Sequence, residues 1–156
     1  MSPDWLTLAR VLHVLGVVVW IGGVAFVTAV LLPALRTIDD AELRASLFER
    51  LEHRFAWIAR GAVILVGASG LYMIAAFDLW YRFSSPAYWW MHAMVAIWAV
   101  FALVLFVAEP LLLHRLFTRQ IREKPRIAYA VIQRAHWLLL LLSLIVTAGA
   151  VAGVHG

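Results

Sequence analysis

Two histidines lie in strongly apolar segments and are the residues best suited to chemistry. His13 begins the stretch "HVLGVVVWIGG", and His92 lies in "WWMHAM". An imidazole nitrogen ligates metal ions and haem iron. Polar side chains inside a membrane are costly and mark functional sites. We therefore predict that His13 and His92 are ligands. The alternative is a structural hydrogen bond from each ring to a backbone carbonyl.

The composition indicates which elements must position these histidines. Hydrophobic residues make up 65% of the chain and charged residues only 14%, which is typical of a membrane protein. Four segments are long enough to cross a bilayer as helices, and they cover residues 6–33, 55–78, 87–113 and 131–153 approximately. We expect an all-α integral membrane protein, an antiparallel bundle of four transmembrane helices, with residues 1–156 as a single domain.

The basic residues predict the orientation of this bundle. Eleven of the 13 lysines and arginines fall in the segments after the first and third spans, which belong on the cytoplasmic side. Both termini and the aromatic connection "DLWYRFSSPAYWW" are then outside, as in a multi-pass protein of a bacterial-type cytoplasmic (inner) membrane. The partner that the composition implies is the lipid bilayer. The net charge of +4 reflects this topology, so we predict no nucleic-acid partner.

The first cytoplasmic segment has a helical pattern of its own. Asp39 or Asp40 can cap a helix in which Leu43, Leu47 and Leu51 recur at four-residue spacing. This helix either lies on the inner membrane surface or extends the second span into the cytoplasm.

The predicted topology brings the two histidines to one leaflet. The first and third helices of an up-down bundle are diagonal, so His13 and His92 can meet on the central axis. Gly16 and Trp20 share the helical face of His13. A small residue there leaves room for a flat macrocycle, or it lets two helices pack closely. The first interpretation predicts one haem with two histidine ligands.

A weak internal repeat supports this arrangement. Pro33 and Pro110 lie near the inner ends of the first and third spans. Trp57 follows His13 by nearly the same number of residues as Trp137 follows His92. We interpret the halves as two pseudo-symmetric helical hairpins.

Other residues offer further ligands. The chain has no cysteine, so a metal or haem must rest on histidine, methionine or carboxylate. His53 and His136 are either surface histidines or the ligands of a second haem in the inner leaflet. We interpret His114 as a surface histidine. Arg10, one turn outward of His13, either pairs with a haem propionate or snorkels.

The pattern His13-x-x-Gly16-x-x-x-Trp20-x-Gly22-Gly23, followed by "LLPAL", resembles the first helix of copper resistance protein D-like membrane domains. "RFAWIARGAVILVGASGLYM" is similar to their helix that begins with Arg-Phe and ends in a glycine-containing turn. The first helix also resembles HemJ-type protoporphyrinogen oxidases, four-helix membrane proteins, and this resemblance implies a haem b ligand at His13. Met94 stands where both families tend to carry a lysine, which argues against porphyrinogen oxidation. Met94 is an alternative axial ligand.

We therefore expect a membrane-embedded b-type haem protein for electron transfer or redox chemistry, with a quinol, a porphyrinogen or a small oxidant as partner. It would be a cytochrome or a haem-dependent oxidoreductase. The alternative is a copper-binding or copper-transport protein that uses His and Met in the outer leaflet. A subunit without a cofactor is a third possibility. The sequence leaves open whether a redox protein partner or a homo-oligomer is involved.

Overall fold

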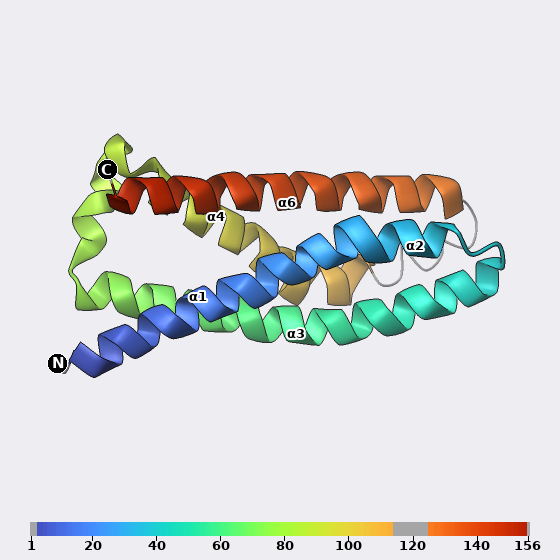
Figure 1. Ribbon diagram of the computed structural model, residues 1–156, viewed down its shortest axis with the longest axis horizontal. Coiled ribbons are helices and arrows are strands. Elements are labelled where there is room, and N and C mark those ends of the chain that lie inside the picture. The colour runs from blue at the N-terminus through green and yellow to red at the C-terminus, as the bar shows by residue number, and fades with distance from the viewer. Residues whose placement is uncertain (1–2, 114–124, 156) are drawn as a thin grey trace.

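Four long helices form the protein, and they run alternately up and down (Figure 1). The computed structural model describes residues 3–113 and 125–155, and it contains helices and no strands in those two ranges. The four candidate membrane spans are Asp4–Arg36, Ala41–Ala76, Pro86–Glu109 and Ile127–Gly153. The expected all-α bundle of four transmembrane helices is therefore confirmed, and the chain is a multi-pass membrane protein.

The first span is one continuous rod made of three segments of two helical types. It consists of α1 (Pro3–Phe26), the π-helix η1 (Val27–Leu31) and α2 (Leu32–Arg36). Pro33 explains the change of type, because a proline has no N–H and its ring displaces the carbonyl four residues earlier. The chain accommodates the displaced carbonyl by widening one turn into a π-helix. The helix thus continues past Pro33.

The second span begins much earlier than the apolar segment does. Helix α3 runs unbroken over Ala41–Ala76, so the amphipathic segment is an extension of the span and not a separate surface helix. Asp40 is its N-cap, and one carboxylate oxygen accepts hydrogen bonds from the backbone N–H groups of Glu42 and Leu43 at 2.8 and 3.0 Å.

Two short 3-10 helices, η2 (Leu79–Ser84) and η3 (Pro86–Tyr88), lead into α4 (Trp89–Leu103). Asp78, which begins this connection, adopts a left-handed conformation with a φ of 51°. A second π-helix, η4 (Val104–Leu113), follows α4, and α6 (Pro125–His155) is the last span. His114 and most of the basic segment between η4 and α6 lie outside the described residues.

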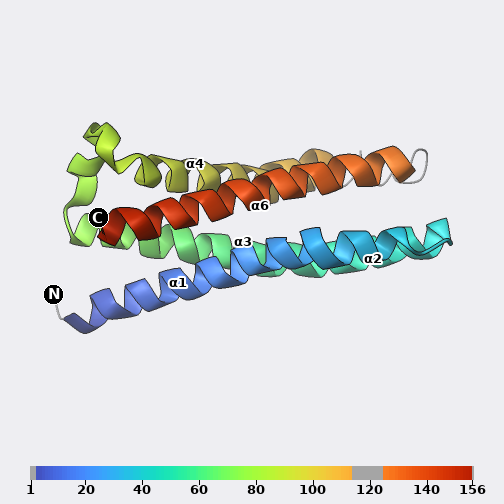
Figure 2. The same cartoon turned by 45° about the horizontal axis from the view of Figure 1, so that its top comes forward.

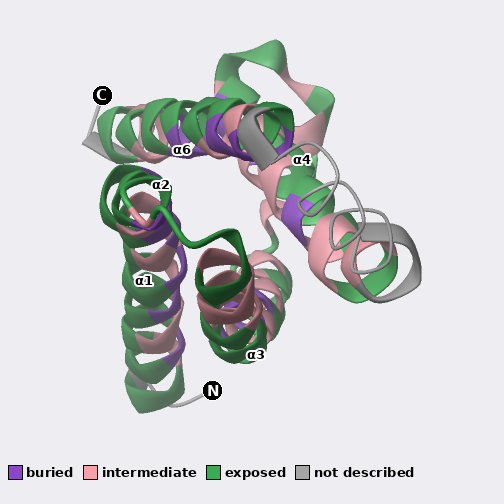
Figure 3. Ribbon diagram, turned by 90° about the vertical axis from the view of Figure 1, so that its right-hand side faces the viewer, coloured by how far each residue is buried: buried purple, intermediate pink, exposed green. Residues whose placement is uncertain are grey.

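The helices form two hairpins that pack against each other (Figure 2). Helix α1 packs along α3, and α4 packs along α6, while α1–α6 and α3–α4 contacts join the hairpins. The first and third spans are therefore diagonal, as expected. Viewed from one end, the buried residues lie on the sides of the helices that face their neighbours (Figure 3). Both chain ends lie at the same end of the bundle as the η2–η3 connection (Figure 1).

Candidate functional site

The imidazole of His13 binds the backbone of the neighbouring helix. Its Nδ1 lies 3.1 Å from the Val66 carbonyl oxygen and 3.1 Å from the Ser69 hydroxyl on α3. Ser69 Oγ also lies 2.6 Å from the Leu65 carbonyl, to which its O–H donates, so this oxygen accepts from His13. Both partners of Nδ1 are then acceptors, and Nδ1 carries the proton. Within the described residues Nε2 has no hydrogen-bond partner, so its lone pair is free for a ligand.

Glycines bring α1 and α3 close together around His13. A Cβ on Gly70 would lie 3.1 Å from His13 Cε1, so the ring lies directly over this glycine. A Cβ on Gly16 would lie 2.8 Å from Val66 Cγ2. The space beside Gly16 is thus taken by α3, which is the close packing that the sequence left as an alternative. A role for Gly16 beside a macrocycle stays a prediction.

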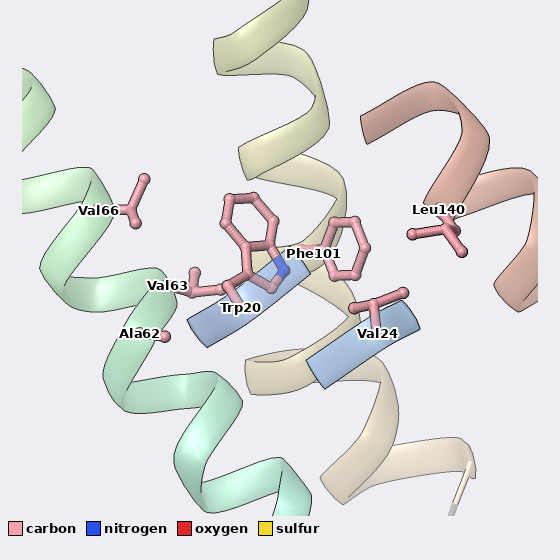
Figure 4. Close-up of a cluster of buried hydrophobic side chains, with 7 residues drawn as sticks. All are labelled: Trp20, Val24, Ala62, Val63, Val66, Phe101 and Leu140. Atoms are coloured by element: carbon pink, nitrogen blue, oxygen red, sulfur yellow. The ribbon is translucent and has the colours of Figure 1, made fainter. Parts of the chain in front are cut away.

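Trp20 lies at the centre of the bundle, two turns inward of His13. Its side chain is 3% exposed and contacts Phe101 of α4 edge-on, with ring centroids 4.8 Å apart. Figure 4 shows it among buried side chains from all four spans. The indole Nε1 is shielded from solvent and has no hydrogen-bond partner among the described residues. A buried N–H without an acceptor is unfavourable, so this indole carries an energetic cost in the structure as described.

His92 faces the η2–η3 connection. Its Nε2 lies 3.1 Å from the Phe83 carbonyl and its Nδ1 lies 3.3 Å from the Tyr88 carbonyl. The Phe83 ring packs edge-on against the imidazole, with centroids 5.4 Å apart. His13 and His92 therefore have no partner in common, and a ligand role for His92 requires its Nε2 to leave the Phe83 carbonyl.

The other predicted site residues occupy separate places. Arg10 lies with its guanidinium carbon 5.0 Å from the centre of the Phe77 ring. His53 is exposed on α3, whereas His136 on α6 is half-buried and bonds the Ile132 carbonyl of its own helix through Nδ1, at 2.9 Å. Met94 is half-buried on α4. No three His, Cys, Asp or Glu side chains of residues 3–113 and 125–155 are grouped as a metal site.

A second polar group of residues lies near the beginnings of α3 and α6 and was not predicted. Gln133 donates from Nε2 to the Thr28 carbonyl at 2.6 Å. One turn earlier on α6, Tyr129 packs edge-on against Phe48, with ring centroids 5.8 Å apart. The Arg44 guanidinium carbon lies 5.5 Å from the centre of the Tyr129 ring. These residues join η1, α3 and α6.

An ion pair between the two hairpins was also missed. Arg60 of α3 pairs with Glu109 of η4, and its Nε donates to the Leu105 carbonyl at 3.0 Å. The Arg60 guanidinium carbon lies 5.1 Å from the centre of the Trp57 ring. Arg60 lies inside an apolar span, and the structure directs it toward a carboxylate in the other hairpin. The pair could have been predicted from the sequence, because Arg60 and Glu109 are both charged residues inside apolar spans.

The fold and these contacts define a class: a four-span membrane protein with a half-buried histidine on its first span, whose Nε2 has no hydrogen-bond partner among the described residues. Comparison of the chain with models of known families, with curated proteins and with solved structures finds no match.

Proposed function

We propose that the protein binds haem b in the membrane and serves electron transfer or a related redox reaction, with His13 as an axial ligand. One observation carries this proposal. The Nδ1–H of His13 donates to the Val66 carbonyl, which leaves Nε2 unprotonated and without a partner among the described residues. Ligating histidines typically donate their other ring N–H to a carbonyl or carboxylate, since this fixes the tautomer and the ring orientation.

The contacts of the two histidines favour one imidazole ligand over two, because His92 Nε2 lies against the Phe83 carbonyl. Trp20 Nε1 lacks an acceptor among the described residues, and we propose that it donates to a polar substituent of the bound group. The second axial position would fall to His92, after release of the Phe83 carbonyl, or to Met94. Bound haem supplies one-electron chemistry, and its axial ligands set its potential. His13 would hold and orient the group, and the apolar helices would exclude water from it.

Copper binding is the second candidate, and one observation favours it. Met73 lies one turn outward of Gly70 on α3, on the helical face that receives the His13 ring. A thioether and an imidazole together suit Cu(I). Haem and copper differ in spectrum and in metal content, so one sample distinguishes them.

The test is an optical spectrum of the detergent-purified protein, before and after dithionite, with metal analysis of the same sample. A Soret band with reduced α and β bands at one haem per chain supports the proposal. A stoichiometry of two would support the additional site at His53 and His136. A colourless protein from haem-sufficient cells would refute haem binding, and copper in that sample would favour the alternative.

Substitution of His13 distinguishes ligation from a structural role. We expect His13→Gly to lose the haem and added imidazole to restore the spectrum, because a free imidazole can occupy the space of the deleted ring. A structural hydrogen bond would give no such spectral rescue. His92→Ala should change the spin state if His92 is the second ligand and leave the spectrum unchanged otherwise. Full haem retention in His13→Gly would exclude His13 as the ligand.

The remaining expectations belong to this proposal as well. The protein would reside in a bacterial-type inner membrane with both termini outside, and its electron partner would be a quinone or another redox molecule. Met94 replaces the lysine that the resembling families tend to carry, so we do not propose porphyrinogen oxidation.

A further inference from the structure

The hydroxyl of Ser69 connects His13 to the backbone of α3 through two hydrogen bonds. It accepts from His13 Nδ1 at 3.1 Å and donates to the Leu65 carbonyl at 2.6 Å. The Val66 carbonyl, at 3.2 Å, is a more distant acceptor for the same proton. Ser69 is only 9% exposed, so water competes little for these bonds. Because hydrogen bonds in a chain polarise one another, donation to Leu65 makes the Ser69 oxygen a better acceptor for His13.

The position of the Ser69 proton is decided by the Val66 carbonyl. This carbonyl oxygen lies 3.1 Å from His13 Nδ1 and can only accept. If Ser69 turned its proton to Nδ1, the Nδ1 lone pair would face the lone pairs of the carbonyl oxygen. The arrangement in which Nδ1 carries the proton avoids this repulsion, and it directs the N–H at two acceptors together. Such donation raises the electron density of the ring and makes Nε2 a stronger electron-pair donor.

The same turn of α3 fixes the plane of the imidazole. A Cβ on Gly70 would lie 3.1 Å from His13 Cε1 and 3.5 Å from Nδ1, so this edge of the ring lies close to the helix backbone. A half-turn of the ring about its Cβ–Cγ bond would exchange Nδ1 for a carbon and lose both acceptors. Ser69 thus contributes to the direction in which Nε2 points as well as to its strength as a donor of electrons.

We propose that Ser69 is a positioning residue that acts through His13, holding the ring in one orientation and strengthening Nε2 as a ligand. The hydrogen bonds that carry this inference exist without a bound group, whereas its consequence for haem rests on the proposed function. Loss of a group that orients a ligating histidine weakens metal binding about 10- to 100-fold. We expect Ser69→Ala to weaken haem binding by at least about tenfold. It should also raise the reduction potential, because a less electron-rich imidazole stabilises ferric iron less.

The decisive measurement is NMR of 15N-labelled histidine in the haem-free full chain in detergent micelles. The His13 signals are assigned by their absence from His13→Gly. In Ser69→Ala the Nδ1–H proton signal should move upfield, because the proton loses one acceptor. The 15N signals of Nδ1 and Nε2 should move apart, because donation from Nδ1–H makes the two nitrogens more alike. Ser69→Thr keeps the hydroxyl and should return these signals toward their native positions.

Ser143→Ala is the matched control. Ser143 is also a buried serine, and its hydroxyl donates to the Leu139 carbonyl four residues earlier at 2.7 Å, as Ser69 donates to Leu65. No hydrogen bond joins it to His13 within the described residues, so its loss should leave the His13 signals unchanged. If Ser69→Ala does not fold, Ser69→Cys serves instead, because a thiol accepts only weakly. It should shift the signals in the same direction.

The two proposals can fail separately. Unchanged His13 signals in the folded Ser69 variant would overturn the positioning role, as would an equal change in Ser143→Ala. With haem bound, an unchanged haem affinity and potential in Ser69→Ala would overturn it even if the NMR signals moved. A native chain that binds no haem would refute the proposed function alone, and the NMR signals would then decide the role of Ser69 by themselves.

Discussion

Glycines in the spans receive aromatic or imidazole rings from neighbouring helices. A Cβ at each of five glycines would lie within about 3.1 Å of such a ring; the pairs are Gly23–Phe55, Gly67–Trp98, Gly70–His13, Gly149–Trp89 and Gly153–Trp90. In a membrane, helices associate through close packing more than through the hydrophobic effect. A ring placed over a glycine maximises that contact. His13 therefore occupies the kind of place that rings fill elsewhere in the bundle.

Gly67→Ala is expected to destabilise the bundle by about 1–3 kcal/mol, as overpacking does. The new Cβ would lie 2.6 Å from the Trp98 ring, which cannot easily move because its Nε1 donates to the Val63 carbonyl at 2.9 Å. Gly61→Ala on the same helix is the control, because nothing lies within 4 Å of its Cβ position. Reversible unfolding in SDS, followed by tryptophan fluorescence, measures both. Equal effects would show that the Trp98 contact is unimportant.

His13 could be selected from the sequence because it is a titratable residue in an apolar helix, but its partners could not. Val66 and Ser69 contribute through a backbone carbonyl and a hydroxyl on another helix, and no pattern within α1 specifies how α3 is rotated against it. The orientation of His92 depends in the same way on the path of the η2 connection, which brings the Phe83 carbonyl to its ring. The sequence shows which side chains could act as ligands, but it does not show which residues of the neighbouring helices they contact.

At the level of the helix, the π-helix η1 explains why Gln133 is buried. The Leu32 N–H bonds the Val27 carbonyl, so it is not the α-helical partner of the Thr28 carbonyl. The next N–H that could serve would belong to residue 33, which is a proline and has none. Gln133 Nε2 supplies the missing donor from α6. A proline within one helix thus creates a binding position for a side chain of another.

This account predicts that Pro33 and Gln133 are energetically coupled. In the native chain, Gln133→Leu leaves the Thr28 carbonyl buried without a donor and should cost about 1–3 kcal/mol. In a Pro33→Ala background the backbone N–H of residue 33 is restored, so the same substitution should cost clearly less. A double-mutant cycle in SDS unfolding measures the difference. Additive effects would mean that the Thr28 carbonyl does not depend on Gln133.

At the level of the molecule, the four-span topology followed from composition, since apolar segments of this length have few alternatives to a transmembrane helix. The capped helix at the start of α3 was also readable, but whether it extends the second span or lies on the membrane surface was not, because that depends on the packing of Phe48 on Tyr129 of another helix. The prolines of the two hairpins correspond, because Pro33 follows the π-helix η1 closely and Pro110 lies within the π-helix η4. The histidines of the two halves have different partners.

The orientation in the membrane can be measured directly, because the chain has no cysteine. We expect Ser84→Cys, at the end of η2, to react with an impermeant maleimide in intact cells. Asp39→Cys, next to the cap of α3, should react only after the membrane is opened. The expectation follows from the basic residues beside Asp39 and the positive-inside rule. The reverse labelling pattern would place both termini in the cytoplasm.

The Arg60–Glu109 pair is expected to stabilise the assembly of the two hairpins, because it joins α3 to η4. Removal of one charge leaves the other half-buried and unpaired, so Glu109→Leu should lower the free energy of unfolding by about 3 kcal/mol. The double variant Arg60→Met with Glu109→Leu should be less affected than either single variant, because no charge is then left without a partner. SDS unfolding of the three variants measures this, with Asp4→Asn as an exposed control. If the double variant loses as much as the two single variants together, the pair does not act as a unit, and the hairpins are held by their other contacts, such as the packing of Trp20 on Phe101.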